Sequence, residues 1–173
     1  FYTIFRVLEV RYYNLKSFTP DISIIGGLAA LKESRSKKKI YAHFWDYDVY
    51  LNIKDKQVNN TIPYAVFLDE DMVYHSDYSM LNSKAPLVDS NKYYPGLVKF
   101  LKKFEVDTGL PICFAAHPKI SHHNLHNLSN LLQGIKCSIG NTAELVKNSK
   151  IVLLHASTSM SFAVLFKKPA VFL

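Results

Sequence analysis

Short, continuous apolar runs alternate with helix-like segments from Tyr64 to Leu173, and this alternation limits the fold more than any other feature. Strands that are apolar at every position are typical of a parallel sheet covered on both faces. We therefore predict an α/β fold, with a Rossmann-like parallel sheet and helices on both faces. The predicted strands are 64–68, 112–116, 135–139, 151–154 and 170–173.

The segments between these runs carry helix signals. Leu97, Leu101 and Phe104 share one face of an amphipathic helix that Gly109-Leu110-Pro111 ends. Asn141, with Glu144 three positions on, has the pattern of a helix start. The other predicted helices are 122–132, 142–148 and 158–166.

The first sixty residues are harder to assign. We predict a strand that ends at Gly26-Gly27, a short helix over 28–33 and a strand over 40–45. The polar stretch 52–62 favours a boundary or linker. Residues 1–60 are therefore expected to be the end of an N-terminal domain with its linker.

Residues 61–173 are then expected to form a Rossmann-like domain. The first residue is Phe1 rather than Met, and the final strand-like run stops abruptly at Leu173. We therefore expect the chain to be a piece of a longer protein, with this domain incomplete at its C-terminal side.

Composition narrows the class of partner. The chain has 173 residues, 49% hydrophobic and 20% charged, so it can bury a sizeable core. No apolar run approaches the roughly 18–20 residues that span a bilayer. The formal net charge of +7 favours nucleotides, phosphorylated lipids, nucleic acid or a membrane surface. The run 35–39 indicates a solvated loop, with attraction to a membrane surface as its functional alternative.

Cys113 and Cys137 both lie in apolar runs without metal-ligand spacing. Buried free thiols are typical of a reducing compartment. We therefore expect a cytoplasmic protein, with peripheral association at the inner face of the membrane as the functional alternative.

Two of the predicted strands end in polar motifs. His117-Pro118 follows the strand 112–116, and residues His155 to Ser159 follow the strand 151–154. Because ligands bind outside the carboxyl ends of strands in open α/β sheets, these motifs predict one shared site. The alternative for His117-Pro118 is a turn in which Pro118 fixes the backbone and His117 is idle.

The second motif also precedes a predicted helix. Ser157 and Thr158 are expected at the N-terminus of helix 158–166, where free backbone N–H groups favour a phosphate. The alternative is a simple helix cap. Three successive hydroxyl residues, Ser157, Thr158 and Ser159, exceed what one cap needs.

Acidic residues supply the candidate bases. Asp69-Glu70-Asp71 ends the strand 64–68, with His75 and Asp77 just beyond. Carboxylates can abstract a hydroxyl proton or bind sugar hydroxyls, and a solvated acidic loop is the alternative. Asp46 and Asp48 form a second acidic cluster with aromatic neighbours.

The remaining motifs argue against a metal site, a dinucleotide site, a hydrolase, a P-loop protein and a zinc ribbon. His122 and His126 are four residues apart, but without a neighbouring Glu or a third ligand a surface helix face is favoured over a metal site. No Gly-x-Gly-x-x-Gly, Gly-x-Ser-x-Gly, Walker loop or Cys-x-x-Cys motif is present. We expect neither a metal nor another cofactor.

The order of an acidic cluster, His-Pro at a strand end and a Ser/Thr pair opening a helix resembles bacterial sialyltransferases and related capsule or lipopolysaccharide glycosyltransferases of the GT-B fold. The resemblance covers roughly residues 40–173. It is carried by Phe67 to Asp71, by Ala115 to Pro118, and by His155 to Ser159 through Lys168-Pro169.

The resemblance implies a site residue by residue. His117 and Pro118 would contact the nucleotide phosphate and ribose, and Ser157, Thr158 and Ser159, next to His155, would hold the phosphate. The general base would come from the acidic motif, as Asp69 or Asp71. In the sialyltransferases the base lies in the N-terminal domain, so Asp46, Asp48 or a residue outside this chain is the alternative.

The implied reaction is metal-independent transfer of a sialic acid or Kdo-like sugar from a CMP donor to a surface polysaccharide or lipopolysaccharide. The partners would be a nucleotide-sugar donor and a glycan or glycolipid acceptor. Polyol-phosphate transfer of the teichoic-acid type from a CDP donor is the nearest rival, and a non-catalytic nucleotide-sugar-binding module is another. Nucleic-acid binding is supported by charge alone, and we do not expect it.

Overall fold

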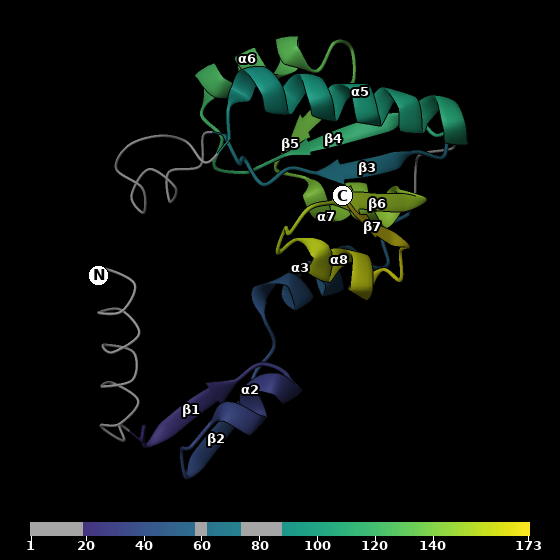
Figure 1. Ribbon diagram of the computed structural model, residues 1–173. Coiled ribbons are helices and arrows are strands. Elements are labelled where there is room, and N and C mark those ends of the chain that lie inside the picture. The colour runs from purple at the N-terminus through teal and green to yellow at the C-terminus, as the bar shows by residue number, and fades with distance from the viewer. Residues whose placement is uncertain (1–18, 58–61, 74–87) are drawn as a thin grey trace, which may run out of the picture. The chain divides into compact units, whose positions relative to one another are not determined.

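The computed structural model describes residues 19–57, 62–73 and 88–173 (Figure 1). The chain divides between Trp45 and Asp46 into two compact units. Each unit has its own sheet, and we describe the two separately.

The first unit contains a parallel strand–helix–strand motif. Strand β1 (Ile22–Ile25) pairs with β2 (Lys38–Tyr41), and α2 (Leu28–Glu33) connects them (Figure 1). The strand predicted before Gly26-Gly27 and the helix predicted over 28–33 are therefore confirmed.

Strand β2 does not follow the prediction of a strand over 40–45. It begins at Lys38 and ends at Tyr41, opposite the last residue of β1, Ile25. The ladder stops here because β1 ends at Ile25; at the next residue, Gly26, a Cβ atom would lie only 2.6 Å from the Phe44 ring. Beyond the ladder, the Ala42 N–H still donates to the Ile25 carbonyl at 3.0 Å.

The second unit alternates helices and strands. From Ala65 onward the order of the described elements matches the predicted order, and the strands 112–116 and 151–154 match in their bounds. The elements are α3 (Trp45–Ile53), β3 (Ala65–Leu68), α5 (Ser90–Thr108), β4 (Ile112–Ala116), α6 (His122–Leu131), β5 (Lys136–Ile139), α7 (Thr142–Asn148), β6 (Ile151–Leu154), α8 (Met160–Leu165) and β7 (Ala170–Phe172).

These strands form one parallel sheet in the order β5-β4-β3-β6-β7. Strand β3 lies at the centre, with Ala65 opposite both Ile112 of β4 and Ile151 of β6. The chain first adds β4 and β5 on one side and then returns to place β6 and β7 on the other. The order therefore reverses between β3 and β6, which is the topological switch point of a doubly wound sheet.

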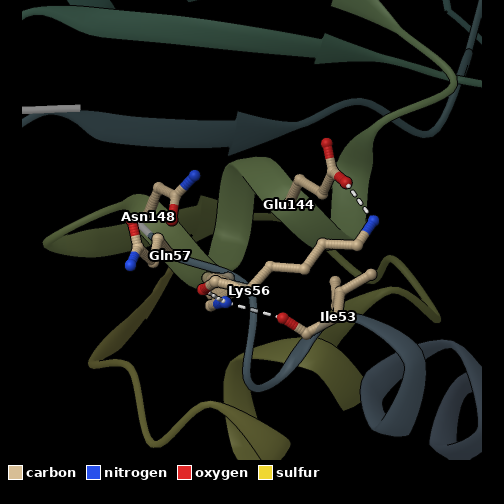
Figure 2. Close-up of a pocket in the computed structure, with 6 residues that line it drawn as sticks. Ile53, Lys56, Gln57, Glu144 and Asn148 are labelled. Carbon is tan, nitrogen blue, oxygen red and sulfur yellow. Dashed lines mark hydrogen bonds and ion pairs between the residues drawn. The ribbon is translucent and has the colours of Figure 1, made fainter. Parts of the chain in front are cut away.

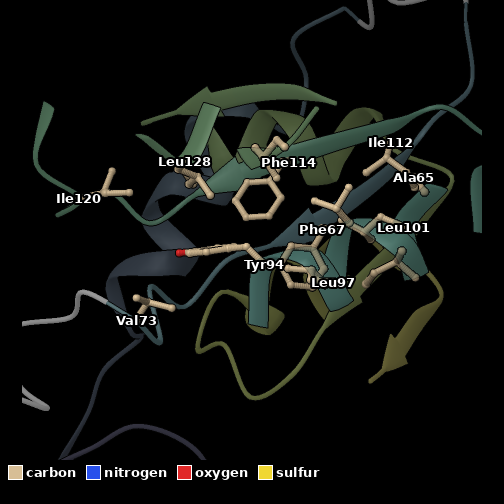
Figure 3. Packing of buried hydrophobic residues seen from close by; sticks show 14 residues of the cluster. Ala65, Phe67, Val73, Tyr94, Leu97, Leu101, Ile112, Phe114, Ile120 and Leu128 are labelled. Carbon is tan, nitrogen blue, oxygen red and sulfur yellow. The ribbon is translucent and has the colours of Figure 1, made fainter. Parts of the chain in front are cut away.

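Helices cover both faces of this sheet. On one face Phe67 and Phe114, whose ring centroids are 5.2 Å apart, pack beneath α5 and α6 with Tyr94, Leu101 and Leu128 (Figure 3). On the other face the neighbouring strand residues pack against α3, α7 and α8. That second cluster includes Ile53, Val66, Val146, Val152, Leu154 and Phe162. The predicted α/β, Rossmann-like sheet with helices on both faces is confirmed.

Helix α3 belongs with the second unit, although it precedes the predicted boundary at residue 60. Ile53 is buried in the core of the second unit, and Val49 packs against it. The polar stretch 52–62 thus begins inside a helix. Residues 58–61 lie outside the described residues.

The thiols and the helices agree with two further expectations. Cys113 is buried and Cys137 half-buried, and both are free. Burial is the main cause that raises the pKa of the Cys137 thiol to about 11. Across the described ranges, no helix combines the length and apolar character that crossing a membrane requires.

Candidate functional site

The strand order brings the predicted motifs to one edge of the sheet. Leu68, at the end of β3, lies opposite Ala115 of β4 and Leu154 of β6. His117 and His155 therefore follow the two strands that flank β3, and Asp69 follows β3 itself. The backbone N–H of Asp69 donates to the Ala115 carbonyl at 3.0 Å, which extends the β3–β4 pairing into the site.

The acidic motif after β3 turns sharply back into the protein. Asp69 is only 4% exposed and Asp71 only 3% exposed, whereas Glu70 between them is half-buried. Asp71 has φ 53°, in the left-handed region that Asp tolerates better than most residues. A solvated acidic loop, the alternative interpretation of this motif, does not describe Asp69 and Asp71.

Burial determines the protonation of Asp69. Burial raises the pKa of this carboxyl to about 7; nearby backbone amides of Asp71, His117 and Glu70 lower it, and the Asp71 carboxylate raises it. Within the described residues, neither carboxylate oxygen of Asp69 forms a hydrogen bond of good geometry. A buried and poorly paired carboxylate is costly, so protonation relieves the cost.

The alternation of side chains along β3 indicates where the Asp69 side chain lies, and the pKa values of two neighbouring groups agree with it. After burial, the Asp69 carboxylate is the next cause that raises the pKa values of Tyr93 on α5 and Cys137 on β5. In a strand, alternate residues share a face, so Asp69 follows Phe67 toward the face under α5. The Asp69 carboxyl therefore lies beneath the start of α5.

Glu70 crosses the switch point. The backbone N–H of Ala156, just after β6, donates to the Glu70 carboxylate. Next to it, the His155 ring meets Phe67 edge-on at 5.6 Å and Tyr93 at 5.9 Å between ring centroids. His155 therefore packs into an aromatic cluster, while Glu70 ties the two strand ends together.

The hydroxyl residues lie in a turn before α8. The helix begins at Met160, two residues later than predicted, and its N-cap Ser159 makes no side-chain capping bond. The N–H groups of Met160, Ser161 and Phe162 donate to the carbonyls of Ser157, Thr158 and Ser159 at 3.1–3.2 Å. The first N–H groups of α8 are therefore already paired.

The turn also has backbone N–H donors before Met160, and only some of them are paired. Ala156 N–H is held by Glu70, and Ser159 N–H donates to Ser157 Oγ at 3.3 Å. Among the described residues, the backbone N–H groups of Ser157 and Thr158 have no acceptor. These two amides and the neighbouring hydroxyls are the donors that an anion would meet.

His117 and Pro118 form a tight turn after β4. The Ile120 N–H donates to the His117 carbonyl at 3.1 Å, and the Lys119 N–H donates to His117 Nδ1 at 3.3 Å. Because Nδ1 accepts, the neutral ring carries its proton on Nε2. Pro118 is exposed and His117 half-buried. The turn is thus observed, and it presents the His117 ring in a form that donates from Nε2.

The second acidic cluster divides between two roles. Asp46 accepts a hydrogen bond from the Ser161 hydroxyl and thereby joins α3 to α8, whereas Asp48 is exposed. Nothing in the sequence pairs Asp46 with a residue 115 positions away.

The remaining predicted candidates do not form a site here. His75 and Asp77 lie outside the described residues. His122 and His126 are exposed on α6. In the ranges that the structure describes, no three His, Cys, Asp or Glu residues lie together as a metal site would require.

A pocket of about 400 Å³ lies between α7 and the residues that end α3 (Figure 2). Lys147 donates to the Ile53 carbonyl at 2.6 Å and to the Lys56 carbonyl, and Lys56 pairs with Glu144 at 3.3 Å. Lys147 thus supplies a donor to carbonyls at and just beyond the end of α3, as basic side chains commonly do. None of the predicted site residues lines this pocket.

Comparison of the chain with protein-family models and with curated proteins finds no match. The architecture is therefore shown by the structure alone. The resemblance to sialyltransferases and related glycosyltransferases remains a proposal that is argued from the motifs.

Proposed function

We propose that this chain carries the donor-binding domain of a GT-B glycosyltransferase, which transfers a sialic acid or Kdo-like sugar from a CMP donor to a surface polysaccharide or lipopolysaccharide. The observation that supports it best is the arrangement at the switch point. His117 and the turn Ser157–Ser159 follow the two strands next to β3, where ligands of doubly wound sheets bind.

In this proposal the donor phosphate is bound by neutral donors without a metal. His117 donates from Nε2, and the turn donates from the Ser157 and Thr158 amides and from its hydroxyl groups. Such preorganised donors stabilise the charge that develops on a departing nucleotide phosphate. The net charge of +7 favours the approach of an anionic donor.

The catalytic assignment of Asp69 and Asp71 needs more than this arrangement. A general base must come within hydrogen-bond reach of the acceptor hydroxyl. Exposures of 4% and 3% keep both carboxyls away from an acceptor in the described conformation. Donor binding is therefore the function that the described geometry supports best. We keep Asp69 as the proposed base, since a pKa of about 7 suits proton abstraction at neutral pH.

The proposal includes a cellular location for the protein. The free thiols Cys113 and Cys137 favour the cytoplasm, and a glycolipid acceptor would bring the protein to the inner face of the membrane. The lysines of the segment 37–39 are exposed or half-buried, in keeping with a weak attraction to an anionic surface.

The test is calorimetric titration of the chain with CMP, CDP and UDP, repeated with His117→Ala and Ser157→Ala. We expect CMP to bind selectively and each substitution to weaken binding by about 10- to 100-fold, as for loss of a hydrogen bond to a charged group. His123→Ala, an exposed histidine on α6, is the matched control and should bind CMP as the parent does.

Three other results would redirect the proposal. A preference for CDP favours polyol-phosphate transfer. Selective CMP binding without any turnover of CMP-sugars by the intact protein favours a binding module. A well-folded chain that binds no nucleotide at all would contradict a donor site at the switch point.

A further inference from the structure

The turn after β6 already holds an anion of its own. The Glu70 carboxylate accepts from Ala156 N–H, the first of three consecutive backbone amides. The next two, those of Ser157 and Thr158, have no acceptor among the described residues. The Glu70 carboxylate thus occupies one of three neighbouring N–H donors, and the other two can donate to a ligand oxygen.

A carboxylate oxygen and a phosphate oxygen compete for the same kind of donor. Both are anionic acceptors that form strong hydrogen bonds with backbone N–H groups. Two negative charges at adjacent amides also repel each other. The Ala156 amide can therefore serve Glu70 or a ligand phosphate, but not both at full strength.

Glu70 can also move away. Its side chain is half-buried, whereas Asp69 and Asp71 on either side are buried. A Glu side chain has several rotatable bonds, so it can turn toward water without disturbing the strand that precedes it.

We propose that Glu70 is an internal competitor for the donor phosphate: its carboxylate holds the Ala156 amide in the ligand-free protein and leaves it when the phosphate binds. This inference rests on the proposed function. Glu70 then opposes phosphate binding and limits the affinity of the site for CMP, the nucleotide released by the reaction.

The experiment compares the parent chain with Glu70→Ala and Glu70→Gln by calorimetric titration with CMP and with inorganic phosphate. We expect Glu70→Ala to bind both about tenfold more tightly, because an acceptor and a negative charge are removed. Glu70→Gln should bind more tightly than the parent but less tightly than Glu70→Ala, since its neutral oxygen still accepts from Ala156.

Asp107→Asn is the matched control, because it makes the same change in net charge. Asp107 is exposed near the end of α5, where it pairs with Lys103 at 2.9 Å. Its binding constants should stay within about twofold of the parent, as for an exposed and screened charge.

Hydrogen exchange at the Ala156 amide provides a readout that does not depend on nucleotide binding. Loss of the Glu70 acceptor should speed this exchange in Glu70→Ala; unchanged exchange would overturn the inference. If the parent binds CMP and Glu70→Ala binds it equally or more weakly, the inference fails and the proposed function survives. If neither folded protein binds CMP or phosphate, both fail together.

Discussion

The two ends of strand β3 are built in opposite ways. At the amino end, the buried Tyr64 donates from its hydroxyl to the Leu145 carbonyl at 2.7 Å, and its own carbonyl accepts from Lys150 N–H at 2.8 Å. At the carboxyl end, Asp69 is equally buried, yet neither carboxylate oxygen has a well-formed hydrogen bond with a described residue.

This difference in hydrogen bonding indicates that the amino end of β3 contributes to stability, whereas the carboxyl end does so less. Buried polar groups are normally paired, so an end that follows this rule is explained by folding alone. Exceptions to the rule concentrate at functional sites, where local stability is sacrificed. The contrast therefore supports placing the function at the carboxyl end, where the switch point also lies.

The largest effect should come from Asp69→Asn. Because the folded-state pKa of about 7 lies above the ordinary value of 3.8, folding favours the protonated carboxyl. The parent chain should lose stability as the pH rises from about 4 to about 7. At pH 8 the neutral amide should raise the free energy of unfolding by about 4 kcal/mol, since a tenfold change in proton affinity equals about 1.4 kcal/mol. Near pH 4 the gain should vanish.

Urea denaturation of both proteins at pH 4, 6 and 8 measures this difference. Asp107→Asn, at an exposed ion pair on α5, should change stability by less than about 1 kcal/mol at every pH. An Asp69→Asn protein that is less stable than the parent at pH 8 would mean that the Asp69 carboxylate is well paired, and the contrast between the two ends would disappear.

A smaller effect of opposite sign is expected from Lys147→Met, at the helix end that packs beside the amino end of β3. The substitution keeps an unbranched side chain one atom shorter but removes the donor to the Ile53 and Lys56 carbonyls. The free energy of unfolding should fall by about 2 kcal/mol, as for hydrogen bonds from a charged group. Lys99→Met, an exposed lysine of α5, serves as control in the same denaturation series. Equal stability of the two variants would show that the Lys147 bonds contribute nothing.

The smallest effect is expected from Tyr64→Phe, which leaves the Leu145 carbonyl without its donor. We expect a loss of about 1 kcal/mol at pH 7, the usual net value of one hydrogen bond. Burial raises the pKa of Tyr64 to about 12, so the loss should not vary between pH 5 and 8. Thermal unfolding of parent and variant measures the loss. A gain in stability would contradict the view that the polar groups at the amino end of β3 are well paired.

The local parts of this architecture could be predicted from the sequence because they depend on nearest neighbours. Apolar runs such as 112–116 and 151–154 indicate buried strands, and Gly109 ends α5 in the left-handed conformation, with φ 69°. The convergence of His117 and His155 at one sheet edge followed from the parallel arrangement.

The contacts that complete the site could not be predicted in this way. Glu70 meets Ala156 only because β6 pairs with β3, and Asp46 meets Ser161 only because α3 and α8 cover the same face. Both contacts depend on the order of the strands, which no local pattern contains. Helix α8 begins later than predicted because the carbonyls of Ser157 to Ser159 accept from amides only three positions on, which is the spacing of a tight turn rather than of an α-helix.

The central position of β3 also has a consequence during synthesis. Strand β3 is the first strand of its sheet to be made, but its partner β6 follows 86 residues later. At about 5–20 residues per second, one edge of an apolar strand would wait roughly 4–17 s for its neighbour. Unpaired strand edges invite association with other chains. The nascent protein therefore passes through an interval with an unpaired strand edge before the switch point, and with it the Glu70–Ala156 contact, exists.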